Sequence, residues 1–171
     1  MNFRFRWTAL AVLAATLVPA TGALAGETAY DAATVARGRY LVTISGCNDC
    51  HTPGGGEKGP AVPLQDWLTG VPVGFQGPWG TSYPSNLRLV LNSMSEAQWL
   101  EHARKERLPP MPWFNLREMS DADLKAVYAF VRSLGSAGVA SPAYVAPGGK
   151  VNTPVIVFVP VSPPQQAAAL R

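Results

Sequence analysis

Hydrophobic residues recur every three or four positions in three stretches of the chain, which is the spacing of one face of an α-helix. The pattern predicts helices over residues 31–46, 95–106 and 120–135. The repeating hydrophobic positions are Val35, Tyr40, Leu41, Val42 and Ile44 in the first stretch, Trp99, Leu100 and Ala103 in the second, and Leu124, Val127, Tyr128, Val131 and Leu134 in the third. The segments between them contain much of the proline and glycine and read as loops and short turns.

The residues at the starts of these stretches support the helix prediction. Asp31, Ser95 and Ser120 carry side-chain oxygens of the kind that accept hydrogen bonds from the free N–H groups of a first helical turn. Gln98 stands three residues after Ser95 and completes the pattern of a capping box. Gly38 lies inside the first helix, where glycine costs about 1 kcal/mol relative to alanine. We expect a close helix crossing at this glycine.

The N-terminus has the three-part layout of a secretory signal peptide. Arg4 and Arg6 precede an apolar run over residues 8–18, and residues 23–25 end the segment with the pattern Ala-Leu-Ala. We expect residues 1–25 to be removed and the mature protein to reside in the periplasm. The alternative is an uncleaved membrane anchor, although the apolar run is shorter than the roughly 20 residues that a span requires.

Length and charge narrow the possible classes. Without the leader, about 146 residues remain, which suits one domain rather than two. The formal net charge of +3 includes Arg4 and Arg6, so the mature chain is close to neutral. It lacks the excess of positive charge that would favour binding to nucleic acid. The 16 prolines and 16 glycines concentrate in residues 53–84 and again after residue 141.

A Cys-x-x-Cys-His motif follows the first predicted helix and carries the strongest chemical signal. Cys47 and Cys50 have the spacing at which two thiols form thioethers to one haem, and the adjacent His51 supplies an imidazole to the iron. A redox-active dithiol is an alternative for the cysteine pair. A zinc site would need further ligands, and the chain has no other cysteine and one other histidine, His102. The motif occurs once, which predicts one covalently bound haem c.

Several further motifs occur in fixed order around this one. They are Gly38-Arg39-Tyr40-Leu41, Asn86-Leu87, Pro110-Met111-Pro112, the run from Ser120 to Leu124 and the run from Tyr128 to Leu134. With them, the chain resembles a monohaem class I cytochrome c over about residues 33–135, and most closely the cytochrome c subunits and domains of periplasmic dehydrogenases. Those proteins often continue the middle motif as Asn-Leu-Thr-Pro-Asp, whereas Arg88 follows here.

The resemblance implies an all-α class I cytochrome c fold, with about three to four helices and long loops wrapped around one covalently bound haem. The cytochrome c domain is expected to cover residues 26–138. Residues 139–171 then form an extended, proline- and glycine-rich C-terminal tail. The β-branched run at residues 155–159 either lies extended across the domain or docks on another subunit as an added edge strand. The last seven or so residues are expected to be disordered.

The second axial ligand of the iron decides between an electron carrier and an open haem site. Met111 lies between two prolines, about 60 residues after His51, in a loop whose stiff backbone suits a weak ligand. The family resemblance favours the same residue. Met94 and Met119 precede helix caps, where packing is the expected role. His102 lies in a charged stretch and is expected to be a solvated helix residue, although it remains an alternative ligand.

The surroundings of the haem can be outlined as well. The middle of the chain is rich in aromatic residues that we expect to wall the haem, namely Trp67, Phe75, Trp79, Tyr83, Trp99, Trp113 and Phe114. Trp79 or Tyr83 is a candidate hydrogen-bond donor to a propionate, and Arg88 is a candidate counter-charge or else an exposed arginine. Pro60 or Pro63 is a candidate carbonyl partner for the imidazole of His51.

Three functions are compatible with these residues. The first is a periplasmic electron carrier that passes single electrons through a haem ligated by His51 and Met111, without catalysis of its own. Its partners would be a redox donor and acceptor, such as a periplasmic or membrane-bound dehydrogenase or a terminal oxidase. The second is an electron-accepting subunit of a periplasmic dehydrogenase complex. The third is a haem enzyme or gas sensor with an open distal site.

Overall fold

The computed structural model describes residues 30–160 and is mostly helical, as predicted. The helices are α1 (Ala32–Ile44), α2 (Cys47–His51), α3 (Gly55–Lys58), α4 (Leu87–Asn92), α5 (Glu96–Ala103), α6 (Trp113–Glu118) and α7 (Asp121–Ser133), with short 3-10 turns η1 (Gly59–Ala61) and η2 (Leu64–Asp66). The strands are β1 (Gly74–Gly77), β2 (Gly80–Ser82) and β3 (Val155–Val157). No helix within residues 30–160 is long and apolar enough to cross a membrane. The predicted signal peptide and the last residues of the tail lie outside the described part.

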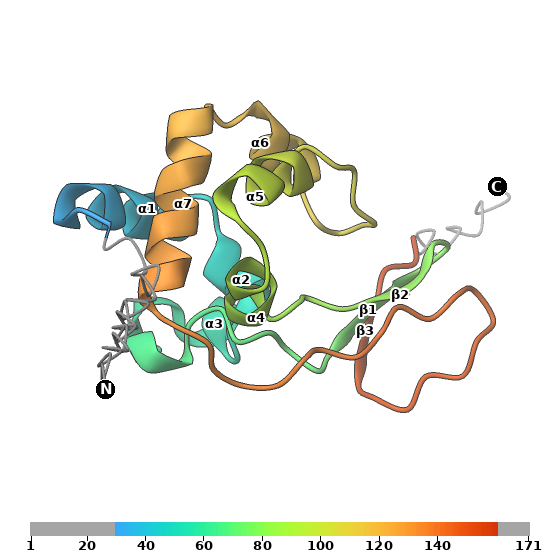
Figure 1. Ribbon diagram of the computed structural model, residues 1–171. Coiled ribbons are helices and arrows are strands. Elements are labelled where there is room, and N and C mark those ends of the chain that lie inside the picture. Colours follow the sequence, from blue (N-terminus) through green and yellow to red (C-terminus); the bar gives the residue numbers. More distant parts are fainter. Residues whose placement is uncertain (1–29, 161–171) are drawn as a thin grey trace, which may run out of the picture.

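Helices α1 and α7 cross closely and form the frame of the domain (Figure 1). The crossing passes over Gly38, which is buried. A Cβ atom at this position would lie 1.9 Å from the carbonyl oxygen of Ala126, so no larger residue fits without moving a helix. The predicted close crossing at Gly38 is therefore confirmed.

The predicted caps of the three long helices are also confirmed. Asp31 accepts a hydrogen bond from the backbone N–H of Thr34, and Ser120 caps α7 in the same way. Ser95 and Gln98 form the expected capping box at the start of α5. Helix α5 ends at Ala103, about three residues earlier than predicted.

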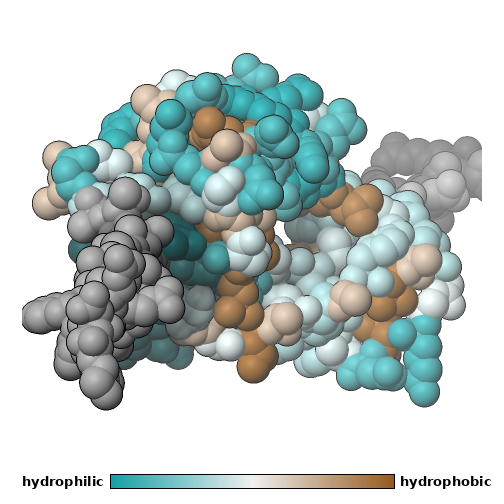
Figure 2. Space-filling view, viewed as in Figure 1, coloured by the Kyte–Doolittle hydropathy of each residue, from teal (hydrophilic) through white to brown (hydrophobic). Residues whose placement is uncertain are grey.

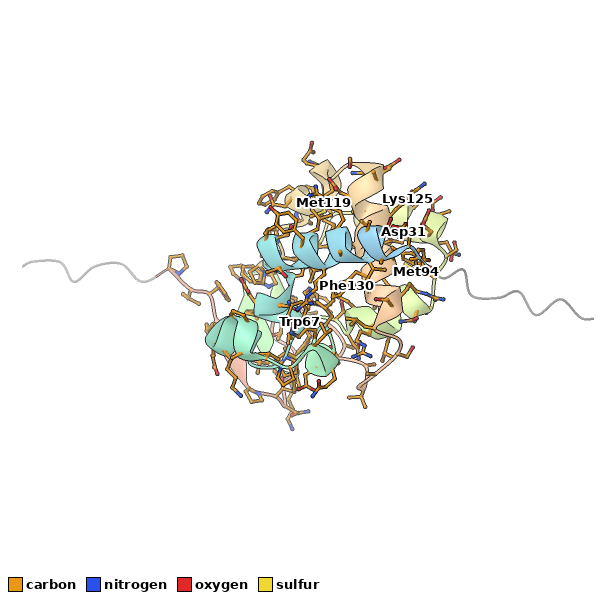
Figure 3. All side chains as sticks on the ribbon, turned by 90° about the vertical axis from the view of Figure 1, so that its left-hand side faces the viewer. Asp31, Trp67, Met94, Met119, Lys125 and Phe130 are labelled. Carbon is orange, nitrogen blue, oxygen red and sulfur yellow. The ribbon has the colours of Figure 1, made fainter. Side chains whose placement is uncertain are left out.

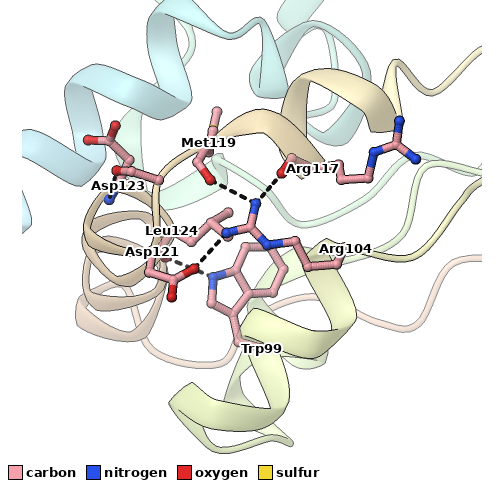
Figure 4. Close-up of polar contacts among 8 residues, drawn as sticks. Trp99, Arg104, Arg117, Met119, Asp121, Asp123 and Leu124 are labelled. Atoms are coloured by element: carbon pink, nitrogen blue, oxygen red, sulfur yellow. Dashed lines mark hydrogen bonds and ion pairs between the residues drawn. The ribbon is translucent and has the colours of Figure 1, made fainter.

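Helix α5 is joined to α7 by buried and charged contacts that Figure 4 shows. The indole Nε1 of Trp99 donates to the carbonyl of Leu124 at 2.8 Å. The guanidinium of Arg104 donates to the carbonyls of Arg117 and Met119 and pairs with Asp121 at 2.6 Å. These bonds fix the chain on both sides of the loop between α5 and α6.

The hydrophobic core lies between α1, α5 and α7 and the loop that follows η2. Trp67 and Phe130 lie next to each other beneath α1, with ring centroids 6.2 Å apart (Figure 3). Trp67 also donates its indole N–H to the carbonyl of Val62 at 2.9 Å. The core thus holds the long helices and the glycine-rich middle of the chain in one body.

A small sheet of order β2-β1-β3 lies beside the helices, and the sequence pattern did not predict it. Strands β1 and β2 form an antiparallel hairpin, and β3 pairs with β1 in parallel, with Phe75 opposite Ile156. The tail therefore adds an edge strand to its own chain. Its expected extended course is confirmed, while the last seven residues lie outside the described part.

Candidate functional site

A cavity of about 410 Å³ opens between the helices and the β-hairpin. Figure 2 shows the surface hollowed between these two parts, with hydrophobic residues near the hollow. The four residues that the sequence proposed for the haem all line this cavity, namely Cys47, Cys50, His51 and Met111. Most of the other lining residues are apolar, and the volume lies within the roughly 300–1,000 Å³ usual for ligand and cofactor pockets.

The two cysteines lie on helix α2, which begins after Gly46 in the left-handed conformation at φ 67°. They form no disulfide. Burial raises the pKa of the Cys47 thiol to about 11, and burial also raises the pKa of Cys50. A reactive dithiol requires a lowered thiol pKa, because the thiolate is the nucleophile. The environment therefore disfavours a redox dithiol and suits thiols that end in stable thioethers.

His51 is held in the orientation and charge state of a metal ligand. Its Nδ1 donates a hydrogen bond of 2.7 Å to the carbonyl of Ser85, which leaves Nε2 as the free nitrogen. Burial lowers the pKa of His51, and this outweighs the opposite effect of the hydrogen bond. The ring is thereby kept neutral, as iron ligation requires.

The carbonyl partner of His51 differs from the predicted one. The prediction of Pro60 or Pro63 is wrong: the partner is Ser85, and the carbonyl of Pro63 accepts from the N–H of Asp66. The segment at residues 83–86 lies beside the imidazole instead. Sequence spacing gave no signal for Ser85, because any residue can supply a backbone carbonyl.

Helix α2 is tightly packed against the turn that follows it. The hydroxyl of Thr52 donates to Asn48 at 2.7 Å and accepts from the N–H of Leu68 at 2.8 Å. Gly55 packs against α2 so closely that a Cβ atom there would lie 1.8 Å from the carbonyl oxygen of Asn48. The attachment motif is thus fixed by its own helix and by the turn behind it.

Met111 reaches the cavity from the loop between α5 and α6. Pro109, Pro110 and Pro112 restrict the backbone on both sides of it. The hydroxyl of Ser82 donates to the carbonyl of Pro109 at 2.7 Å and ties this loop to strand β2. The loop therefore presents the thioether from a fixed backbone.

The other proposed ligands divide between core and cavity. Met94 and Met119 pack against the hydrophobic core and do not line the cavity. His102 does line it and is half-buried, so the expectation of a solvated helix residue is wrong. Its ring lies 6.2 Å from that of Trp99, and burial, with Arg107 and Lys105 nearby, lowers its pKa.

The aromatic residues also separate into two groups. Phe75, Tyr83 and Trp99 line the cavity, whereas Trp67, Trp79, Trp113 and Phe114 do not. The indole of Trp79 donates to the carbonyl of Phe75, and the hydroxyl of Tyr83 bonds that of Thr153. The polar ends of both candidate propionate donors therefore have protein partners.

Arg88 is neither a cavity residue nor exposed, so both predictions for it are wrong. It is buried, and its guanidinium donates to the carbonyls of Leu134 and Gly135 at the end of α7 and to that of Gln65. The cation that lines the cavity within residues 30–160 is Arg107. Nothing in the sequence distinguishes Arg107 from the other charged residues around it.

These features together are those of a c-type haem protein. They are the packed helices, the attachment motif and an apolar cavity lined by His51 and Met111. The family model described as cytochrome c matches residues 35–135, and the chain belongs to the cytochrome c family. The family resemblance and the class I cytochrome c fold are confirmed by this match. The chain accordingly binds one covalently attached haem c, for which Cys47 and Cys50 stand next to His51.

A curated relative points in the same direction. The chain is 28% identical over 120 residues to a nicotinate dehydrogenase subunit of Pseudomonas putida. The alignment covers 63% of this chain and 9% of the relative, so the chain spans a small part of that protein's length. No solved structure matches the chain.

Proposed function

We propose that this protein is a periplasmic electron carrier whose haem iron is ligated by His51 and Met111. Membership of the cytochrome c family already implies electron transfer. The observation that supports the finer proposal is the position of both side chains on one cavity with Cys47 and Cys50. Haem supplies a one-electron couple at its iron, and the protein keeps the ligands in place in both oxidation states.

The residues of the chain have distinct parts in this proposal. Cys47 and Cys50 hold the haem permanently. His51 offers Nε2, because Nδ1 is engaged by Ser85. Met111 closes the opposite face, and its thioether favours the reduced iron and so raises the reduction potential. Arg107 is placed to offset negative charge on a propionate, because it is the lysine or arginine side chain that lines the cavity in the described part.

The location follows from the leader and is part of the same proposal. Residues 1–25 direct the chain across the membrane and are removed, so the holoprotein is released into the periplasm. Intact mass of the purified holoprotein tests this, with an N-terminus near Gly26 as the expected result. A haem-bearing species that retains residue 1 and is found with the membranes would contradict it.

A second candidate is the electron-accepting subunit of a dehydrogenase complex, which the similarity to a nicotinate dehydrogenase subunit favours. The haem chemistry is the same in both candidates. They differ in that a subunit stays bound to its dehydrogenase, whereas a carrier does not. Purification of the tagged protein from periplasm and membranes distinguishes the two. A shuttle is recovered alone, whereas a subunit is recovered with a dehydrogenase whose substrate reduces the haem.

The test of the proposed function itself is spectroscopic. The purified protein should accept one electron per haem reversibly and should exclude carbon monoxide when reduced, because both axial positions are filled. Ready binding of carbon monoxide by the unmutated protein would instead indicate a haem enzyme or gas sensor.

A further inference from the structure

The chain after Gly135, called the tail in this subsection, lies outside the residues that the family model matches, yet it touches the segment beside His51. We propose that this tail clamps residues 83–86 and thereby fixes the Ser85 carbonyl that orients His51. The inference rests on the haem site proposed above. It assigns Ser141 and Thr153 to that site as positioning residues that act through Ser85.

The tail bonds to the residues on either side of Ser85. The hydroxyl of Ser141 donates to the carbonyl of Pro84 at 2.6 Å. The side-chain amide of Asn86 donates to the carbonyls of Ala137 and Val139 at 2.8 and 3.1 Å. Ser85 therefore lies between two residues that the tail holds.

The clamp continues at residue 83 and at the start of α4. The hydroxyls of Tyr83 and Thr153 lie 2.7 Å apart, and Tyr83 lines the cavity. Asn86 is 2% exposed, and its other amide atom accepts from the N–H of Leu89 at 3.0 Å. Because both ends of the Asn86 amide are engaged, this side chain has a single allowed orientation.

The same contacts reach the backbone of His51. The N–H of Gly70 donates to the carbonyl of His51 at 2.8 Å. A Cβ atom on Gly70 would lie 2.4 Å from Ser141 Oγ and 2.7 Å from the backbone nitrogen of Asn86. One tightly packed region therefore contains His51, Gly70, Asn86 and Ser141.

The tail is itself anchored further along its course, so it can hold these residues in place. Thr81 and Val145 form a pair of backbone hydrogen bonds, and β3 pairs with β1. The ring of Phe158 packs against Phe75 and Trp79, with centroids 5.8 and 6.1 Å apart. Figure 1 shows the chain after α7 running beside α4 and then along the hairpin.

The clamp has a chemical consequence at the iron. A hydrogen bond from Nδ1 to a carbonyl makes the imidazole a more basic ligand, which favours the oxidised iron. Loosening residues 83–86 weakens this bond and should raise the reduction potential. It should also let the Nδ1 proton exchange faster with solvent.

The experiment compares Ser141→Ala and Thr153→Val in the full-length holoprotein. The exchange rate of the His51 Nδ1 proton is measured by NMR, and the reduction potential by spectroelectrochemical titration. We expect about two- to tenfold faster exchange in each variant, the range that corresponds to one net hydrogen bond, together with a higher potential. Thr153→Ser keeps the hydroxyl and should restore both values.

Ser136→Ala is the matched control, because it removes an exposed hydroxyl of the same part of the chain. Unchanged exchange in Thr153→Val, or equal acceleration in Ser136→Ala, would overturn the clamp. Thr153→Val decides the question even where Ser141→Ala yields no holoprotein. Carbon monoxide binding by the unmutated protein would contradict the proposed function, whereas the exchange rates would still decide the clamp.

Discussion

The two faces of the haem cavity are built in different ways. The proximal face comes from one helix, α2, with His51 8% exposed and the neighbouring Thr52 1% exposed. In the proposed ligation the distal face comes from a loop, in which Leu108 is 42% exposed and Met111 is half-buried. Hydrogen bonds and close packing fix the first. The second is held by prolines, by the hydrogen bond from Ser82 and by turn bonds within the loop, such as that from the N–H of Met111 to the carbonyl of Leu108.

Because of this difference, we expect the proximal face to determine whether the haem is retained and the distal face to determine the reduction potential of the iron. On the proposed ligation, we expect His51 to stay bound during electron transfer, because it lies on a packed helix beside two thioethers. A thioether from a loop is a weaker ligand, whose loss leaves the attachment intact. Changes on the proximal face should therefore remove or destabilise the holoprotein, and changes on the distal face should alter the spectrum and the potential.

The largest effect is expected for the attachment motif. Replacing Cys47 or Cys50 with serine should remove one thioether, and the double variant should contain no covalently bound haem. His51→Ala should fail to mature, because the iron ligand and the attachment signal are lost together. Haem staining after denaturing electrophoresis measures this, and a double variant that still stains would be incompatible with c-type attachment.

The packing behind α2 gives the next largest effect. Gly55→Ala should lower the free energy of unfolding by about 1–3 kcal/mol, because overpacking displaces backbone. Gly56→Ala is the control, since its Cβ would lie 3.1 Å from the carbonyl oxygen of Asp49, compared with 1.8 Å at Gly55. Urea unfolding of the two holoproteins gives the comparison. Equal stability of both variants would mean that the proximal face has more room than the structure indicates.

The smallest effect is expected at the distal tether. Ser82→Ala removes the hydrogen bond to Pro109, which is worth about 0.5–1.5 kcal/mol. The haem should remain attached, while the loop releases Met111 more often and reduced protein binds some carbon monoxide. Ser93→Ala, which removes a hydroxyl outside the cavity, is the control. Loss of haem staining in Ser82→Ala would contradict the claim that changes on the distal face leave the haem attached.

The parts that sequence could predict are those that depend on neighbours along the chain. Asp31, Ser95 and Ser120 mark helix starts because a cap acts on residues two or three positions away. Gly38 was informative because glycine inside a helix needs a packing reason. The motif at residues 47–51 is local as well.

The parts that sequence missed depend on long-range pairing. The sheet joins glycine-rich residues 74–82 to a tail about 80 residues away. The β-branched run at residues 155–159 indicated a possible edge strand, but residues 74–82 have no strong strand pattern that would identify them as its partner. The Ser85 carbonyl was missed because its role depends on where the backbone passes. Arg88 and Arg107 look alike in sequence, and only the fold places one against α7 and the other at the cavity.

The central claim is that Met111 closes the distal face opposite His51, and the spectrum of Met111→Ala tests it most directly. A methionine ligand to oxidised haem gives a weak absorption band near the red end of the visible spectrum. The unmutated protein, Met94→Ala and Met119→Ala should show this band and exclude carbon monoxide. Met111→Ala should lose the band, bind carbon monoxide, keep both thioethers and have a lower reduction potential. A Met111→Ala protein that keeps the band and still excludes carbon monoxide would contradict the account.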